Sequence, residues 1–235
     1  MVDKPGRRKT RKAPWAKIGA VGVLALVVVG VGWVVYWNFI FVPPNVYAEL
    51  DTNFGPVYVE LFTSCAPRTV ANFENLSNIG FYDNLVWHRI VPGFVIQTGD
   101  PNTRYGNTSR SDWGSGGSNQ TVPLEVTKCP NLGNYAGYLG MARQGNDTSG
   151  LDTGTSQFYI ILDNSSNTES SLDGYYTVFG EVISGMKYVC DIAKVPTYGS
   201  NSSFDSQPIT PSDALLDSIS ISKSAPVTPQ PITQC

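Results

Sequence analysis

The feature that most constrains this chain is an uninterrupted apolar segment near its N-terminus. Residues 18–42, IGAVGVLALVVVGVGWVVYWNFIFV, contain no Asp, Glu, Lys or Arg. A helix needs about 20 apolar residues to cross a bilayer, and aromatic rings favour the membrane interface. Trp15, Trp33, Tyr36 and Trp37 lie near the two ends of the segment. We therefore predict a transmembrane anchor over residues 18–42.

A cleaved signal peptide is the alternative interpretation of the same segment. The apolar part of a signal peptide is typically about 7–15 residues long and is followed by a cleavage site of small residues. The segment here is longer, and the sequence FVPPNVYAEL that follows it has no A-x-A-like site. A retained anchor is the better interpretation.

Charge is distributed unevenly on the two sides of the predicted anchor. Residues 1–17 carry a net charge of +6, whereas residues 43–235 carry a net charge of −9. Because positively charged flanks stay in the cytoplasm, we predict a single-pass membrane protein with a basic cytoplasmic tail over residues 1–17 and the acidic part outside the cytoplasm. An acidic domain offers no electrostatic footprint for nucleic acid, so we expect no nucleic-acid partner.

The single histidine, His88, restricts the chemistry of the chain. Zinc sites built on two histidines are excluded, and any triad that uses imidazole would depend on this one residue. A hydrolase that pairs Ser or Cys with His88 ranks low, because no G-x-S-x-G motif accompanies it. We expect no metal or cofactor.

Four cysteines, Cys65, Cys129, Cys190 and Cys235, lie on the side predicted to be exported. Disulfides persist in such compartments, but four cysteines allow three pairings, and the sequence does not rank them.

The exported part reads as a turn-rich β domain. After a proline linker at residues 43–45, VYAEL and VYVELF alternate apolar and polar residues around a TNFGP turn, which predicts a β-hairpin. Residues 66–79 show a helical period, and a second short helix is expected over residues 186–193. The remaining predicted strands are LVWHRIV, FVIQTG, GYLGMA, SQFYIIL, TVFGEV and LLDSISI. Residues 223–235 are rich in Pro and Thr, which predicts a disordered tail.

Four sequence blocks stand out in this domain. They are WHRIVPGFVIQTGD at residues 87–100, LGMAR at 139–143, GTSQFYI at 154–160 and LDGYYTVFGE at 172–181. In this order and spacing they resemble a cyclophilin-type peptidyl-prolyl cis/trans isomerase, and the similarity covers residues 46–222. The resemblance implies a mainly β fold, with a closed eight-stranded antiparallel β-barrel capped by two helices and a proline-binding groove on its outer face.

The resemblance also implies roles for individual residues. Arg89 matches the catalytic arginine, with His88 beside it as a second catalytic candidate, although a lone histidine is at least as often a packed structural residue. Phe94 matches a wall of the proline pocket, and Gln97 matches a residue that binds the peptide backbone. The other matched substrate-binding positions are Met141, Ala142, Gln157, Tyr159, Leu172 and Tyr176.

The chain departs from the family pattern at several groove positions. Ser171 stands where many members carry a tryptophan that cyclosporin uses, so tight binding of this drug is not expected. Tyr176 replaces a common histidine, and Arg143 stands where asparagine is usual, which changes the charge near the groove. The loop over residues 101–113 is longer than usual and is expected to reshape the groove rim.

The sequence therefore predicts a membrane-anchored isomerase that assists the folding of exported proteins by rotating X-Pro bonds in proline-containing polypeptides. The alternative is a proline-peptide-binding chaperone or assembly module with weak or no turnover. The substitutions at Ser171 and Tyr176 favour that alternative.

Overall fold

The computed structural model describes residues 46–107, 109–129, 132–145 and 152–235. The predicted basic tail 1–17, anchor 18–42 and linker 43–45 lie outside these residues. Within the described ranges, no helix combines the length and the apolar character needed to cross a bilayer.

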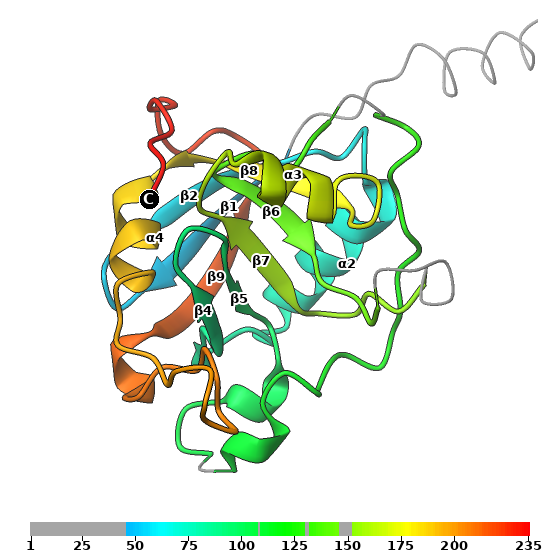
Figure 1. Ribbon diagram of the computed structural model, residues 1–235. Helices are drawn as coiled ribbons and strands as arrows, with labels where there is room; N and C mark the ends of the chain where they lie inside the picture. The colour runs from blue at the N-terminus through cyan, green and yellow to red at the C-terminus, as the bar shows by residue number, and fades with distance from the viewer. Residues whose placement is uncertain (1–45, 108, 130–131, 146–151) are drawn as a thin grey trace, which may run out of the picture. The chain divides into compact units, whose positions relative to one another are not determined.

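One antiparallel sheet forms the body of the domain (Figure 1). Its strands are β1 (Val46–Thr52), β2 (Val57–Leu61), β3 (Leu85–Val86), β4 (Arg89–Val91), β5 (Val95–Thr98), β6 (Tyr138–Met141), β7 (Phe158–Ile161), β8 (Val178–Ser184) and β9 (Leu215–Ser222). They follow the spatial order β3-β9-β1-β2-β8-β6-β7-β5-β4. The two end strands, β3 and β4, are separated in the chain only by Trp87 and His88. The sheet therefore curls until its two ends come together.

This arrangement confirms the mainly β, antiparallel prediction but differs from it in detail. The described residues form a sheet of nine strands rather than eight, and no described strand pairing joins β3 to β4, so the closed barrel is not confirmed. The additional strand arises because the run LVWHRIV, predicted as one strand, divides between two partners. Its first part pairs with β9 and its last part pairs with β5.

The alternation of apolar and polar residues determines which side chains face the core. In the β1–β2 hairpin, which the sequence predicts, Val46, Ala48 and Leu50 are buried. The residues between them point to the opposite face of the sheet. There Tyr47 pairs with Glu60, Glu60 with Glu181 on β8, and Glu181 with Tyr138 on β6. We call these four residues the acidic row.

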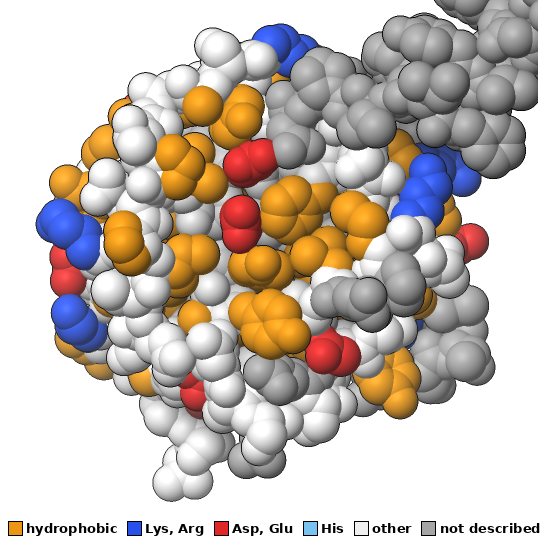
Figure 2. Space-filling model, turned by 90° about the horizontal axis from the view of Figure 1, so that it is seen from above, with side chains coloured by type: hydrophobic (Ala, Val, Ile, Leu, Met, Phe, Trp, Pro, Cys, Tyr) orange, Lys and Arg blue, Asp and Glu red, His pale blue; other side chains and the backbone are white. Residues whose placement is uncertain are grey.

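A face of the domain seen in Figure 2 combines acidic and hydrophobic side chains near its centre, with Lys and Arg at its margins. Within the acidic row, burial and the facing carboxylate of Glu60 raise the pKa of Glu181, while a hydrogen bond with Tyr138 lowers it. Two carboxylates directly opposite each other across antiparallel strands repel each other.

Three α-helices occur among the described residues: α2 (Pro67–Asn78), α3 (Ser166–Leu172) and α4 (Met186–Ile192). The first and the last confirm the two predicted helices. The helix α3 was not predicted, because its sequence SNTESSL has no apolar period.

The start of α2 is completed by a residue far along the chain. The N-cap residue Ala66 offers no side-chain hydrogen bond. Instead, the Glu125 carboxylate accepts hydrogen bonds from the backbone N–H of Arg68, at 3.1 Å, and of Thr69, at 2.8 Å. An acidic side chain at this end of a helix also interacts favourably with the helix dipole.

The core lies between α2 and the inner face of the sheet. The predicted apolar face of α2, Val70, Phe73 and Leu76, is buried. The ring of Phe73 lies 5.3 Å from the ring of Phe158 on β7 and 5.4 Å from the ring of Phe179 on β8, measured between centroids. These contacts join the helix to the middle of the sheet.

The four cysteines form two disulfides, in one of the three possible pairings. Cys65 pairs with Cys129, and Cys190 on α4 pairs with Cys235. The second disulfide, together with a hydrogen bond from the Cys235 N–H to the Leu162 carbonyl, holds residues 223–235 against the domain. The proline-rich composition alone does not reveal this covalent attachment, and residues 223–235 form neither a helix nor a strand.

Candidate active site

A row of four residues crosses the strands at one end of the sheet. Arg89 on β4 pairs with Gln97 on β5, Gln97 pairs with Tyr159 on β7, and Tyr159 pairs with Gly140 on β6. Residues directly opposite each other on neighbouring strands share one face of the sheet. We call these four residues the groove row.

The outward direction of the groove row follows from its neighbours in sequence. Ile90, Ile96 and Ile160 form the adjacent row, and all three are buried in the core. Because side chains alternate between the two faces of a strand, the groove row points to the outer face. The sequence therefore places polar and aromatic side chains outside and isoleucines inside.

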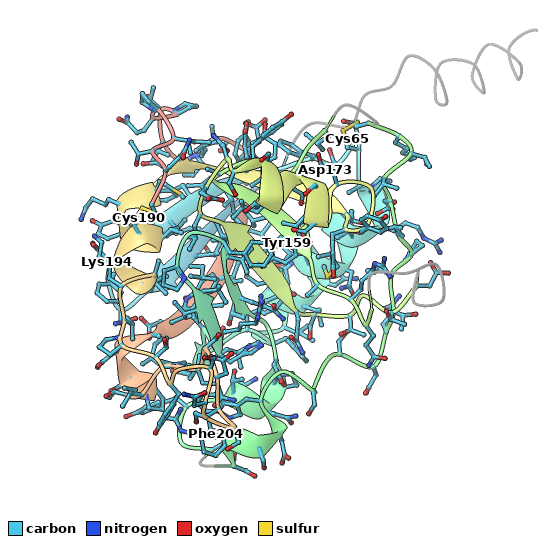
Figure 3. The ribbon with its side chains drawn as sticks, in the orientation of Figure 1. Cys65, Tyr159, Asp173, Cys190, Lys194 and Phe204 are labelled. Atoms are coloured by element: carbon cyan, nitrogen blue, oxygen red, sulfur yellow. A yellow bond between two sulfur atoms is a disulfide. The ribbon has the colours of Figure 1, made fainter. Side chains whose placement is uncertain are left out.

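Gly140 makes room for the ring of Tyr159. A Cβ atom at position 140 would lie 2.2 Å from the Tyr159 Cζ atom and 2.5 Å from its Cε2 atom, far inside van der Waals contact. Figure 3 shows Tyr159 on β7 beneath α3. Its hydroxyl donates to the Asn134 Oδ1 atom at 3.3 Å, and Asn134 in turn donates from its backbone N–H and its amide to the Asp173 carboxylate. The hydroxyl end of the ring is thus held in place.

A cavity of about 230 Å³ lies over the groove row. Its lining consists of Arg89, Phe94, Val95, Gln97, Ala142, Arg143, Tyr159, Leu172 and Tyr176. The apolar part of this lining belongs to a small cluster, separate from the main core, in which Val95, Tyr159, Ile161 and Leu172 are buried. Seven of the predicted site residues therefore meet at one apolar hollow bordered by guanidinium groups.

Arg89 is the half-buried cation of this cavity. Its Cζ atom lies 5.6 Å from the centroid of the Phe94 ring, which is within range of a cation–π contact. Burial lowers the pKa of Arg89, while Tyr176 and Asp205 raise it. A guanidinium nevertheless remains charged at neutral pH.

Tyr176, in the segment that follows α3, also lines this cavity. Its ring meets the ring of Tyr159 edge to face, with the centroids 5.9 Å apart. The Arg143 Cζ atom lies 5.4 Å from the Tyr176 centroid, and the Arg143 Nε–H donates to the Tyr175 carbonyl at 2.5 Å. This arginine, which stands where the family usually has asparagine, therefore supports the wall of the cavity.

Gln157 lines a neighbouring cavity of about 330 Å³ rather than the first one. The two cavities share Gln97, Ala142 and Arg143. The Gln97 Nε2 atom donates to the Gln157 Oε1 atom at 2.8 Å, so the two glutamine amides form one unit between the cavities. Gln97 keeps a second N–H and its carbonyl oxygen for further hydrogen bonds.

The structure does not bring His88 or Met141 to the first cavity. Met141 is 3% exposed and belongs to the main core cluster, so its predicted place on the pocket floor is not observed. His88 is also 3% exposed. Burial, with Arg89 nearby, lowers the pKa of His88 to about 4, although Asp100 acts to raise it. The imidazole is therefore neutral at pH 7 and lies behind the groove.

Sequence reasoning missed Gly140, Val95 and the glycine-rich loop 114–117 that lines the second cavity. The role of Gly140 depends on its pairing with Tyr159, which lies 19 positions away in the sequence. A single glycine in an apolar run offers no signal for such a pairing.

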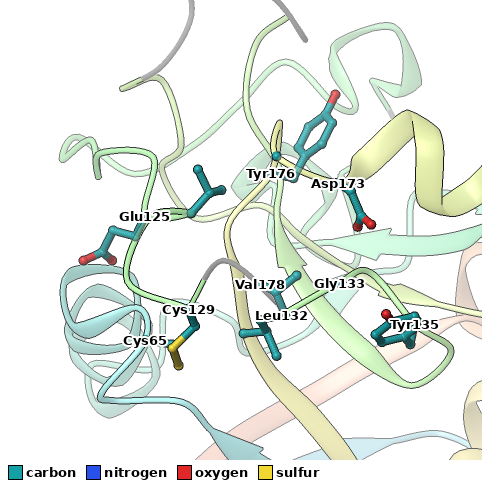
Figure 4. A pocket seen from close by; sticks show the side chains of 11 residues that line it. Cys65, Glu125, Cys129, Leu132, Gly133, Tyr135, Asp173, Tyr176 and Val178 are labelled. Atoms are coloured by element: carbon teal, nitrogen blue, oxygen red, sulfur yellow. A yellow bond between two sulfur atoms is a disulfide. The ribbon is translucent and has the colours of Figure 1, made fainter.

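A larger cavity, of about 490 Å³, also has Tyr176 in its lining (Figure 4). Leu132 and Val178 line its middle, and the Cys65–Cys129 disulfide lies at one end. Tyr176 is the one predicted site residue in its lining, so this larger cavity and the predicted site are different places.

The chemistry open to the first cavity is binding and electrostatics. All four cysteines are paired in disulfides, so none is available as a nucleophile beside His88. Within the described ranges, no group of three or more His, Cys, Asp or Glu side chains is arranged to hold a metal ion. What the cavity provides is an apolar hollow, two guanidinium groups and the amide of Gln97.

Comparison with known proteins agrees with this geometry. The sequence matches the family described as cyclophilin type peptidyl-prolyl cis-trans isomerase/CLD over residues 47–213. A peptidyl-prolyl cis-trans isomerase of Acinetobacter baylyi is 35% identical over 182 residues, which cover 76% of this chain and 89% of that protein. Peptidyl-prolyl cis-trans isomerase B of Bacillus subtilis is 42% identical over 129 residues, covering 55% of this chain and 77% of that protein.

Solved structures agree as well. The crystal structure of a cyclophilin type peptidyl-prolyl cis-trans isomerase of Cryptosporidium parvum has a TM-score of 0.62 and 28% identity, and it covers 76% of this chain and 98% of that chain. The same protein in the presence of the dipeptide Ala-Pro has a TM-score of 0.61.

Proposed function

Because this chain belongs to the cyclophilin family and is a peptidyl-prolyl cis-trans isomerase, we propose that it rotates X-Pro bonds with the proline ring in the cavity of about 230 Å³ over the groove row. The single observation that supports this assignment is the position of Arg89. Its guanidinium borders an apolar hollow, beside Phe94 and in register with Gln97.

Rotation of an X-Pro bond is slow because it breaks amide resonance, against a barrier of about 18–20 kcal/mol. In the twisted transition state the nitrogen lone pair becomes localised. A guanidinium that interacts with this nitrogen binds the twisted form more tightly than the planar form, and only such differential binding accelerates the step. Each ~1.36 kcal/mol of differential binding gives a tenfold rate increase. We assign this role to Arg89.

The other cavity residues hold the peptide while the bond turns. Phe94, Tyr159 and Leu172 offer apolar surface for the proline ring. The amide of Gln97, oriented by Gln157, is placed to bind the peptide backbone. Rotation about one bond requires that one side of that bond is held still, which is a positioning effect. No proton transfer is needed, which fits a site whose nearest imidazole is buried and neutral.

The test replaces the guanidinium in the full chain. We expect Arg89→Ala to lower kcat/KM by about 100-fold or more, equivalent to ~2.7 kcal/mol of transition-state stabilisation. The rate is measured by NMR exchange on a proline peptide. The matched control is Arg68→Ala, because Arg68 is an exposed arginine on α2 away from the cavity.

Equal rates for wild type and Arg89→Ala would contradict the assigned mechanism. Tight peptide binding with turnover near background in the wild-type protein would instead support the binding-module alternative.

Ser171 is the residue that favours this alternative. Its hydroxyl donates to the Thr168 carbonyl within α3, and its side chain adds no aromatic ring to the groove. For the same reason we expect weak binding of cyclosporin.

We further propose that the domain acts outside the cytoplasm on exported proteins, held at the membrane by residues 18–42. The support is the apolar segment itself, the charge of +6 before it and −9 after it, and two disulfides, which persist in oxidising compartments. Protease added to the cytoplasmic face of sealed membrane vesicles should leave the domain intact until the vesicles are lysed. Degradation of the domain before lysis would overturn this orientation.

A further inference from the structure

Asp100 is a fully buried carboxylate directly behind the groove. It comes directly after Gly99, the first residue beyond β5, and its exposed fraction is 0%. It does not line the first or the second cavity. A carboxylate removed from water is strongly unfavourable unless hydrogen bonds compensate it, so its partners show what it holds in place.

Those partners are backbone N–H groups of a glycine-rich loop. The Asp100 Oδ2 atom accepts from the N–H of Gly114 at 2.5 Å and of Gly116 at 3.1 Å. The Oδ1 atom accepts from the N–H of Asn102 at 2.8 Å. An ionised carboxylate only accepts hydrogen bonds, and each of these partners is a donor. The loop therefore folds around the charge.

Glycine is required where the loop meets the carboxylate. A Cβ atom at position 116 would lie 2.2 Å from the Asp100 Oδ1 atom. Gly114 has a φ of +88°, in the region that side chains disfavour. The loop can approach the carboxylate this closely because these two positions carry no side chain.

The opposite side of the loop is held by Gln157. Its Nε2 atom donates to the carbonyl oxygens of Gly114, at 3.0 Å, and of Gly116, at 2.6 Å. Its Oε1 atom accepts from the Gln97 Nε2 atom. Asp100 thus binds the amides, and Gln157 the carbonyls, of the same two glycines. The orientation of Gln157 in turn determines the orientation of Gln97.

We propose that Asp100 is a positioning residue for substrate binding: its carboxylate holds the loop at Gly114 and Gly116 so that Gln157 orients the Gln97 amide toward the peptide backbone. The inference rests on the proposed function, in which Gln97 binds the substrate. Asp100 acts through two intermediates and does not touch the peptide.

The test is a double-mutant cycle in the full chain, with Asp100→Asn, Gln157→Leu and the double variant. Asp100→Asn replaces one of the two acceptor oxygens with an NH2 group, which is itself a donor and faces backbone N–H donors. We expect it to raise both KM and the peptide dissociation constant about tenfold, with kcat changed less than threefold, because a lost ground-state contact acts on binding. In the Gln157→Leu background the same substitution should change KM less than twofold, since the residue through which it acts is gone.

Equal effects of Asp100→Asn in both backgrounds, or a loss of kcat without a change in KM, would overturn the proposal. If Asp100→Asn does not fold, Gly116→Ala tests the same contact from the loop side, because its Cβ displaces the carboxylate. It should show the same rise in the dissociation constant, and the rise should disappear with Gln157→Leu. Failure of the proposed function is detected separately, by full turnover in Arg89→Ala.

Discussion

The same sheet carries two outward rows among the described residues, and a cavity lies over one of them. The groove row, Arg89, Gln97, Tyr159 and Gly140, lies under the cavity of about 230 Å³. The acidic row crosses the neighbouring strands and places Glu60 against Glu181. Both rows combine charged and tyrosine side chains, so residue type alone does not distinguish them.

Two structural differences separate the rows. The groove row contains Gly140, over which the Tyr159 ring lies, whereas every member of the acidic row has a large side chain. The groove row is also bordered by the end of α3, which carries Leu172, and by the segment after it, which carries Tyr176. The missing side chain at position 140 therefore lets the Tyr159 ring lie flat against the sheet, where the ring lines the cavity.

The largest expected effect on activity comes from placing a side chain at position 140. Gly140→Val places atoms where the Tyr159 ring lies, so we expect kcat/KM to fall about 1,000-fold, or ~4 kcal/mol of transition-state stabilisation. Gly199→Val is the matched control, because a Cβ at position 199 meets nothing within 4 Å and this glycine has no positive φ. Retained activity in Gly140→Val would mean that the glycine does not distinguish the two rows.

Removing the Cys190–Cys235 disulfide tests whether the activity of the groove depends on the attachment of residues 223–235. Replacing Cys190 and Cys235 by Ser should lower the free energy of unfolding by about 2–4 kcal/mol, because the bond restricts the unfolded chain. Activity should remain within twofold, since the tail bonds to the carbonyls of Ile183 and Leu162 and not to the cavity lining. Denaturant unfolding measures the first effect. A tenfold loss of kcat/KM would show that the tail supports the groove.

His88, buried behind the groove, should make the free energy of unfolding depend on pH. Its pKa of about 4 in the folded protein lies below the ordinary value of 6.5, so the unfolded chain binds more protons between these pH values. Stability should therefore fall as the pH drops from 6.5 to 4, by roughly 3 kcal/mol in total from this residue. His88→Gln should remove that part of the slope in urea titrations at several pH values. An unchanged slope would contradict burial of a neutral imidazole.

The smallest expected effect lies in the acidic row. Glu181→Gln removes the repulsion with Glu60 and should raise the free energy of unfolding by about 0.5 kcal/mol at pH 7. Because burial and Glu60 raise the pKa of Glu181, this gain should disappear as the pH falls and the wild-type carboxyl becomes protonated. Activity should not change. A loss of activity would connect the acidic row to the groove.

Local patterns in the sequence were enough to predict much of this fold. The β1–β2 hairpin follows from strict alternation, and α2 follows from the spacing of Val70, Phe73 and Leu76. The helix α3 could not be predicted, because its residues are polar and its position depends on contacts with the rest of the domain. The disulfide pairing likewise depends on which distant segments the fold brings together.

Some residues of the candidate site could likewise be predicted from the sequence, and others could not. The resemblance to a family identified Arg89 and Tyr159 because their surrounding motifs are long. It also suggested His88 and Met141, which alternate with outward residues and therefore point into the protein. Gly140 and Asp100 escaped prediction, because their importance lies in what approaches them across the sheet and the loop.

The capping of α2 by Glu125 has a consequence for the order in which the chain is made. The residue that completes the helix follows Thr69 by 56 positions. A ribosome adds about 5–20 residues per second, so the first turn of α2 waits roughly 3–11 s for its partner to be synthesised. During that interval the N–H groups of Arg68 and Thr69 lack the carboxylate that accepts their hydrogen bonds in the folded domain.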